Sequence, residues 1–242
     1  MKSAPLLTHF DRLGGAPDAI PRLRRFVLDL AVRRKLAEQD PNVEPASELL
    51  ERTRAEKARL VKADANNKVK PIPIFTEEKL PFPIPRSWRW SQLAEVGFLN
   101  PRNSAVDTLQ TSFVPKPMLS AEYGIANIHE ARPWGEFKSG YTHFAEGDMA
   151  LAKTTPCFEN GQSTIFRGLV GGIGAGTTEL QVIRPVAISP EYVLNFLKSL
   201  HFIDSGIPRI TGTAGQKRVP THYSASTPFP LPPLAEQHRI VA

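Results

Sequence analysis

A cationic and hydroxyl-rich turn lies within the stretch GDMALAKTTPCFENGQ, residues 147–162. A predicted strand ends there at Lys153, Thr154 and Thr155, and the turn that follows carries Asn160. Lysine and threonine side chains suit phosphate oxygens, and an amide can bond the edge of a base. The same residues also fit a capped turn in which an Asn-Gly pair is selected for its backbone angles. The sequence leaves both interpretations open.

A second cationic segment is the glycine-rich stretch TGTAGQKR, residues 211–218. Glycines allow a backbone to approach a duplex closely, because no side chain stands in the way. The side chains of Gln216, Lys217 and Arg218 then have the length and chemistry to reach phosphates or guanine. A simple capped turn again explains the pattern equally well.

Two other patterns suggest chemistry but lack its supporting residues. Cys157 has no flanking signature of a cysteine nucleophile, so we interpret it as a small buried hydrophobe. The stretch GGIGAGTTE, residues 171–179, lacks the lysine of a Walker loop and precedes a strand rather than a helix. We therefore interpret it as a flexible connector.

Acid-x-lysine fragments of the kind that metal-dependent nucleases use occur at residues 136–138 and 77–79, with Asp107 or Asp18 upstream. Two acids and a lysine meet this pattern by chance in most chains, so a nuclease is only the third hypothesis. No tandem Cys or His spacing indicates structural zinc, and we expect no metal in this chain.

Two helices are predicted before residues 86–230, which mix short strands, turns and a helix and are called the mixed region below. Residues 18–38 show helical periodicity on one face and carry arginines on the others. That apolar stripe consists of Ile20, Leu23, Val27 and Leu30. Residues 45–62 predict a second helix with a narrow apolar seam, typical of packing on a partner helix rather than in a globular core.

The remaining chain divides by composition. Residues 64–85 are a predicted linker, since five prolines follow a polar run. Residues 86–230 alternate short strands, turns and a helix, which indicates an α/β (α+β) fold with a twisted irregular sheet. Within them, residues 112–115 predict an edge strand, because Pro115 cannot donate to a ladder. Residues 231–242 begin another helix behind two prolines.

Composition restricts the class of protein. The 242 residues carry a net charge of +6, which permits a polyanionic partner. No apolar run approaches the ~18 residues of a membrane span. The N-terminus shows no signal-peptide pattern, and the single cysteine fits a reducing cytoplasm.

Six segments, in order over nearly the whole chain, resemble the specificity (S) subunit of type I restriction-modification enzymes. They are PDAIPRLRRFVLDLAVRRKLAEQDP, EPASELLERTRAEKARLVK, PFPIPRSWRWSQLAEV, GDMALAKTTPCFENGQ, TGTAGQKRVP and PLPPLAEQHRIVA. The last is the most specific, since a proline run followed by Leu-Ala-Glu-Gln resembles the family's entry into its spacer helix.

The resemblance implies a non-catalytic subunit that recognises double-stranded DNA. Such a subunit carries two target recognition domains, each reading half of a bipartite sequence, and two spacer helices that pair antiparallel. Modification subunits bind it and methylate adenine with S-adenosylmethionine, and a motor-nuclease subunit adds ATP- and Mg-dependent cleavage. These cofactors are therefore expected on the partner subunits and not on this chain.

On this resemblance, residues 1–63 form the conserved helical region, 86–230 one target recognition domain, and 231–242 the start of the spacer helix. We expect about half an S subunit: a fragment, a truncated gene product, or a half-subunit that forms a homodimer. The predicted DNA-binding residues are Lys153, Thr154, Thr155, Asn160, Gln216, Lys217, Arg218, Thr177, Lys116 and Arg132. The predicted subunit-interface residues are Leu23, Val27, Leu30, Leu234 and Val241. The alternative hypothesis is a docking scaffold that binds DNA weakly alone.

Overall fold

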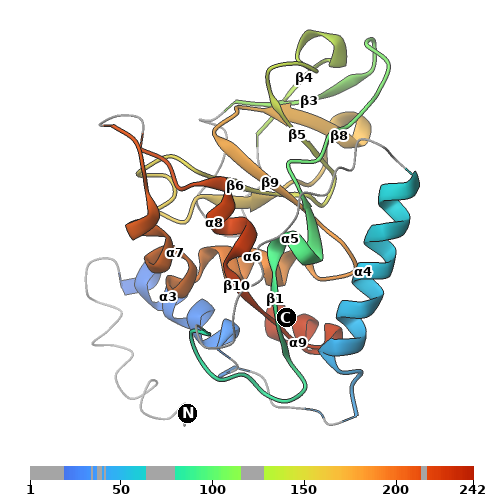
Figure 1. Ribbon diagram of the computed structural model, residues 1–242. Coiled ribbons are helices and arrows are strands. Elements are labelled where there is room, and N and C mark those ends of the chain that lie inside the picture. The colour runs from blue at the N-terminus through green and yellow to red at the C-terminus, as the bar shows by residue number, and fades with distance from the viewer. Residues whose placement is uncertain are drawn as a thin grey trace.

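Strands and helices both contribute to the fold, which is that of a computed structural model (Figure 1). It describes residues 19–33, 35, 36, 40, 42–63, 80–115, 128–213 and 217–242. Within these residues, one four-stranded sheet has the order β2-β9-β6-β7 and is antiparallel, and a second has the order β4-β3-β8-β5 with β3 parallel to β8. The predicted α+β class is confirmed.

The first sheet lies across the middle of Figure 1, the second lies above it, and most helices lie below. The strands of the first sheet are β2 (Gly97–Leu99), β9 (Leu180–Pro185), β6 (Met149–Ala152) and β7 (Ser163–Ile165). Those of the second are β4 (Glu130–Pro133), β3 (Gln110–Val114), β8 (Ile173–Gly176) and β5 (Thr142–Ala145). Short 3₁₀ turns add η3 (Trp134–Glu136), η4 (Val170–Gly172) and η5 (Ile207–Arg209).

The two ends of the mixed region are joined by a separate two-stranded sheet. Strand β1 (Arg89–Gln92) pairs antiparallel with β10 (Pro228–Leu231) in four register pairs, from Arg89 opposite Leu231 to Gln92 opposite Pro228. The chain therefore enters and leaves this region at one place.

The main core lies under the first sheet, where α6 (Pro190–Lys198) and α7 (Leu200–Gly206) pack. The Ser189 hydroxyl caps α6 by accepting a hydrogen bond from the Tyr192 N–H at 3.2 Å, and Pro190 fills the first turn. The apolar face of α6 is fully buried and consists of Tyr192, Val193, Phe196 and Leu197. Two short helices complete this layer, α5 (Leu93–Val96) and α8 (Thr221–Ser226).

The first predicted helix is present as α3 (Ala19–Val32), shorter at its C-terminal end than residues 18–38. It packs against α6 and α7 through its last turn, where Leu30, Ala31 and Val32 are buried. The predicted stripe is not uniformly covered, since Ile20 is 62% exposed. Asp18, the first residue of the predicted range, lies outside the described residues.

The second predicted helix is α4 (Ala46–Ala63), but its expected packing was wrong. Leu49 and Thr53 are each 0% exposed, and Leu49 belongs to the main core of the molecule. The buried Lys57 ammonium donates to the Ala94 carbonyl of α5 and lies 5.3 Å from the Phe98 ring. A narrow seam thus enters a globular core, because a lysine stem and its carbonyl partner extend the buried face.

Two predictions in the second sheet were also wrong. Strand β3 is not an edge strand, because it lies between β4 and β8, and Pro115 follows its last residue. The glycine-rich stretch is not a flexible connector, because Gly174 and Gly176 belong to β8. A Cβ at Gly174 would lie 2.3 Å from the Ser112 carbonyl oxygen, so these glycines allow close approach of strands.

The last helix, α9 (Leu234–Val241), begins behind Pro232 and Pro233 as predicted. Its first turn is fixed to the core by two buried side chains. The Glu236 carboxylate accepts a hydrogen bond from the Trp88 indole at 2.9 Å. The Gln237 amide accepts from the Ser189 N–H at 2.9 Å and donates to the Pro232 carbonyl at 2.9 Å. The Leu-Ala-Glu-Gln motif therefore attaches the helix to the mixed region.

Candidate nucleic-acid interface

The two cationic segments of the sequence meet in the structure. The Thr155 N–H donates to the Lys217 carbonyl at 3.2 Å, and the Val219 N–H donates to the Lys153 carbonyl at 2.9 Å. Arg218 and Thr211 exchange backbone hydrogen bonds of 2.9 and 3.0 Å, which pairs the two ends of the second segment. Backbone segments that lie far apart in the sequence thus lie side by side at the end of β6, which lies near the middle of Figure 1.

A third segment, the turn between β8 and β9, joins them. The Lys153 N–H donates to the Glu179 carbonyl at 2.9 Å. Nε and Nη2 of Arg218 each lie 2.6 Å from a different carboxylate oxygen of Glu179. Lys153, Glu179 and Arg218 are hereafter the 153–179–218 cluster. Sequence reasoning missed Glu179, because an acidic side chain is not expected where DNA binds and no local motif marks it.

The pKa values of both cations in the cluster are shifted, that of Lys153 mainly by burial and that of Arg218 by Glu179. Burial lowers the pKa of the Lys153 ammonium, Glu179 raises it in part, and Arg218 lowers it. The hydrogen bonds to Glu179 raise the pKa of Arg218. Two cations and one anion leave a net positive charge beside the exposed Lys217, which suits a phosphate backbone.

The other predicted DNA-binding residues differ in exposure. Asn160 is exposed in the turn after β6, and Thr155 is half-buried. Thr154 is 8% exposed, and its Oγ1 lacks a hydrogen-bond partner among the described residues. The Thr177 hydroxyl accepts from the Glu179 N–H at 3.2 Å, so it shapes the turn that carries Glu179.

One predicted residue, Arg132, lies apart from the cluster, and two others cannot be placed. Arg132 lies on β4 in the second sheet, paired with Glu130 and 4.7 Å from the centre of the Phe113 ring. Lys116 and Gln216 lie outside the described residues. All ten DNA-binding assignments remain predictions.

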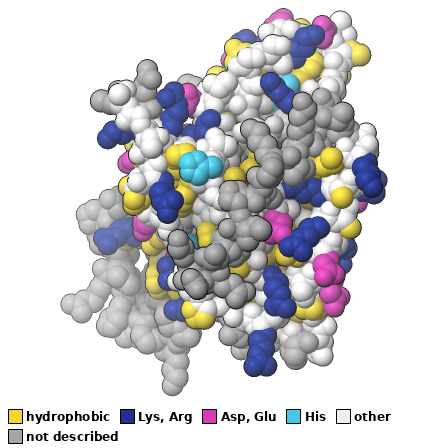
Figure 2. Space-filling view, in the orientation of Figure 1, with side chains coloured by type: hydrophobic (Ala, Val, Ile, Leu, Met, Phe, Trp, Pro, Cys, Tyr) yellow, Lys and Arg dark blue, Asp and Glu magenta, His cyan; other side chains and the backbone are white. Residues whose placement is uncertain are grey.

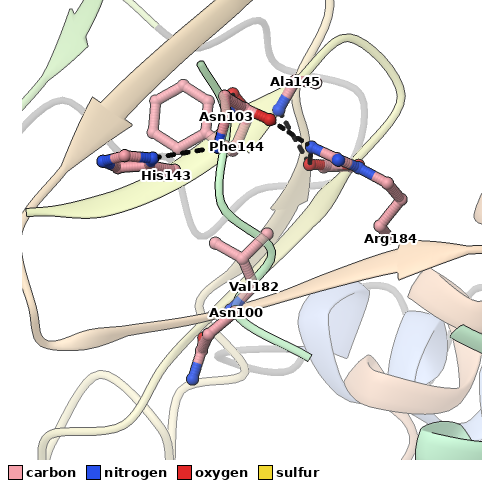
Figure 3. A network of polar contacts seen from close by, with 8 residues as sticks. Asn100, Asn103, His143, Phe144, Ala145, Val182 and Arg184 are labelled. Carbon is pink, nitrogen blue, oxygen red and sulfur yellow. Dashed lines mark hydrogen bonds and ion pairs between the residues drawn. The ribbon is translucent and has the colours of Figure 1, made fainter. Parts of the chain in front are cut away.

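A buried polar network fixes β6 relative to the second sheet (Figure 3). Asp148, just before β6, accepts two hydrogen bonds of 2.8 Å from Arg184 of β9, and Arg184 also reaches the Asn103 side chain at 2.9 Å. Burial raises the pKa of Asp148, and the Arg184 guanidinium opposes that shift. Nδ1 of His143 accepts from the Asn103 N–H at 3.1 Å. Strand β6, which leads into Lys153, is thus held at its beginning.

The predicted interface residues divide between the two terminal helices. Val27 of α3 is 41% exposed and Leu23 is half-buried, while Leu30 is 9% exposed. Leu234 and Val241 of α9 are half-buried and pack against the main core. Part of the apolar surface of these predicted interface residues is therefore already buried within the chain.

Charged side chains are distributed over the visible face rather than gathered in one patch (Figure 2). Along the right edge, where α4 lies in Figure 1, basic and acidic side chains alternate. Arg52 pairs with Glu44 at 2.6 Å and Arg59 with Glu56 at 2.7 Å, so these arginines have acidic neighbours. The arrangement favours a solvated face for α4.

The residues considered for enzymatic chemistry have other contacts. The ammonium of Lys138 lies 2.7 and 2.9 Å from the two carboxylate oxygens of Asp107. Cys157 is half-buried against the apolar cluster around Phe144, as expected of a small hydrophobe. Among the residues that the structure describes, no three His, Cys, Asp or Glu side chains gather as a metal site would require. Residues 77–79 lie outside the described part.

Comparison with known proteins shows which proteins this chain is related to. No family model matches the chain. Over 225 residues, 92% of the chain, it is 50% identical to the specificity subunit of the type I restriction enzyme EcoEI from Escherichia coli and 49% identical to that of EcoAI from the same organism. This chain is homologous to part of a type I specificity subunit. The matched region spans 38% of the length of each specificity subunit.

Solved structures give a weaker likeness. An HsdS specificity subunit from Thermoanaerobacter tengcongensis aligns over 89% of this chain and 47% of its own, with 18% identity and a TM-score of 0.47. A chain from a study of complex assembly in the type I R-M system aligns over 98% of this chain and 48% of its own, at 16% identity and the same TM-score of 0.47. No helix among the described residues is long and apolar enough to cross a membrane.

Proposed function

We propose that this chain recognises DNA sequence as part of a type I specificity subunit, reading one half of a bipartite target. The observation that carries the proposal is the backbone pairing between residues 153–155 and 217–219, which brings two predicted DNA-contacting segments together. Two specificity subunits about half identical to the chain support the same function.

The surface contains groups for both kinds of DNA contact. Lys217 and Lys153 supply positive charge for phosphates, which gives affinity without sequence information. Arg218 and Asn160 carry the planar donors that pair with guanine or adenine edges in the major groove. Removal of a phosphate contact is expected to weaken the affinity for all DNA sequences alike, whereas removal of a base contact weakens only the affinity for the target sequence.

The proposed subunit does no chemistry of its own. Its partners are double-stranded DNA, the modification subunits that use S-adenosylmethionine, and a motor-nuclease subunit that uses ATP and Mg. Such partners fit a cytoplasmic protein. Mg²⁺-dependent cleavage by the purified chain would contradict this assignment and favour the nuclease hypothesis instead.

Selection from a randomised duplex library by the full 242-residue chain tests the function directly. We expect enrichment of one short sequence. Lys217→Ala with Arg218→Ala should then lower the slope of log affinity against log salt by about one unit, since the lost phosphate contact of Lys217 removes roughly one. Loss of the Arg218 base contact should also lower the preference for the enriched sequence. Lys62→Ala with Arg59→Ala is the matched control on α4, because Arg59 also pairs with a glutamate. An unchanged slope in the loop variant contradicts the assignment of this surface.

A second candidate, the docking scaffold, is favoured by the exposed apolar side of α3, where Ile20 is 62% and Val27 41% exposed. This function predicts that Ile20→Glu with Val27→Glu abolishes co-purification with a modification subunit while the chain stays folded. Deletion of residues 1–62 is a poorer test, because Leu49 belongs to the core. Retained co-purification would contradict the scaffold role of α3. The homodimer remains part of this proposal and is measured by sedimentation of the pure chain.

A further inference from the structure

The Glu179 carboxylate lies at the centre of the proposed DNA surface, where an acid repels phosphates. Both of its oxygens bind Arg218, through Nε and Nη2 at 2.6 Å each. Such two-point pairing fixes the plane of the guanidinium, which a single charge–charge contact does not. The pair therefore orients Arg218 as well as compensating its charge.

The position of Glu179 itself is set by its backbone. Its carbonyl accepts the Lys153 N–H at 2.9 Å, and its N–H donates to the Thr177 hydroxyl at 3.2 Å. Arg218 is held in turn by its backbone pairing with Thr211. Both partners are therefore anchored before any ligand arrives, which reduces the entropy lost when Arg218 makes a further contact.

The guanidinium remains accessible while it is held. The Arg218 side chain is 41% exposed and the Glu179 side chain 23% exposed. An arginine whose charge is compensated attracts a phosphate less than an uncompensated one, because the carboxylate repels the same phosphate. A base edge is a neutral set of donors and acceptors, so it loses much less from that repulsion.

We propose that Glu179 is a positioning residue that directs Arg218 to a base edge of the DNA target and withholds it from the phosphate backbone. This inference rests on the proposed function and assigns specificity, rather than affinity, to an acidic residue. Lys153, whose N–H donates to the Glu179 carbonyl, keeps the surface net positive, so the acid does not prevent DNA from approaching.

The test compares Glu179→Gln with the wild-type full-length chain on the sequence that the wild type enriches and on one scrambled duplex. We expect the ratio of the two affinities to fall about tenfold, the value of a good bidentate base contact. On the scrambled duplex, the salt slope should become steeper by about one unit as Arg218 turns to a phosphate. The matched control is Glu56→Gln on α4, which removes an exposed acid from the Glu56–Arg59 pair.

A second variant separates positioning from a structural role. Arg218→Lys keeps the charge but loses the planar fork, so it should lower the affinity ratio as Glu179→Gln does. Adding Glu179→Gln to Arg218→Lys should then cause little further loss of the ratio. The thermal unfolding midpoint shows whether Glu179→Gln or Arg218→Lys has lost its fold. If one of them has, the affinity ratio of the other still tests the inference.

The outcomes distinguish the inference from the proposed function. A wild-type chain that enriches no sequence contradicts the proposed function, and the inference fails with it. If the wild type enriches a sequence and folded Glu179→Gln keeps both ratio and slope, the inference alone is wrong. The affinity ratio of the double variant could instead fall by the sum of the losses in Glu179→Gln and Arg218→Lys. That result would likewise show that Glu179 does not act through Arg218.

Discussion

The indole N–H of Trp88 donates a hydrogen bond to the Glu236 carboxylate at 2.9 Å, across 148 residues of sequence. Trp88 precedes the first strand of the mixed region, and Glu236 lies in the first turn of its last helix. Both side chains are buried, at 1% exposure each. The last helix is therefore fixed to the beginning of the mixed region.

Removing the indole donor should destabilise the fold. Trp88→Phe leaves a buried carboxylate without this donor, and we expect the free energy of unfolding to fall by about 1–3 kcal/mol beyond the change in packing. Denaturant titration measures it. Trp90→Phe is the control, since Trp90 is only half-buried. Equal losses in both variants would show that the bond to Glu236 adds nothing.

A methyl group at Gly174 should disrupt the second sheet. It would lie 2.3 Å from the Ser112 carbonyl oxygen and 2.5 Å from the Phe144 ring. We expect Gly174→Ala to cost more than about 3 kcal/mol, the upper end of ordinary overpacking. Gly172→Ala meets nothing within 4 Å and carries only the strain of a φ of +71°, about 1–2 kcal/mol. Similar costs for the two variants would contradict the close approach of β3 and β8.

Mild acid should weaken the fold through His143. Burial lowers the pKa of this imidazole, backbone hydrogen bonds to Lys138 and Asn103 raise it in part, and Arg102 and Arg184 lower it. The unfolded chain then binds more protons just below pH 6.5, so stability falls as the pH decreases through that value. His201, whose pKa burial also lowers, contributes in the same direction.

Replacing the imidazole tests this pH dependence. His143→Gln should reduce the loss of unfolding free energy between pH 7 and about pH 5.5, measured by urea titration at each pH, with the remainder due to His201. A variant whose pH dependence equals that of the wild type would exclude His143 as a source.

Alkaline pH should strengthen the attachment of α4. Burial lowers the pKa of Lys57 to about 8, from 10.5, and Glu95 opposes the shift only in part. Between these values the unfolded chain binds more protons, so the free energy of unfolding rises with pH. Lys57→Met should flatten that rise, leaving the part due to Lys198, whose pKa is also lowered to about 8. An unchanged rise in Lys57→Met would contradict the buried position of the ammonium.

The features that adjacent residues determine could be predicted from the sequence. The two prolines before Leu234 mark the start of α9. Proline acts on the backbone groups of adjacent residues, so the sequence contains this signal directly. The two cationic segments were likewise recognisable by composition.

Non-local contacts were not predictable in the same way. Strand β8, within residues 171–179, depends on how closely β3 approaches it. The role of Glu179 depends on Arg218, 39 residues away. The seam of α4 was assigned to a partner helix because nothing beside Lys57 in the sequence indicates the Ala94 carbonyl. In each case the deciding partner lies in another part of the chain.

The antiparallel pairing of β1 with β10 has a mechanical consequence. Tension between the chain before Arg89 and helix α9 would act on the Trp88–Glu236 hydrogen bond and on the four register pairs of this small sheet. The 153–179–218 cluster lies on other strands and turns, so the load would bypass it. The surface proposed to contact DNA is therefore insulated from strain transmitted through the terminal helix.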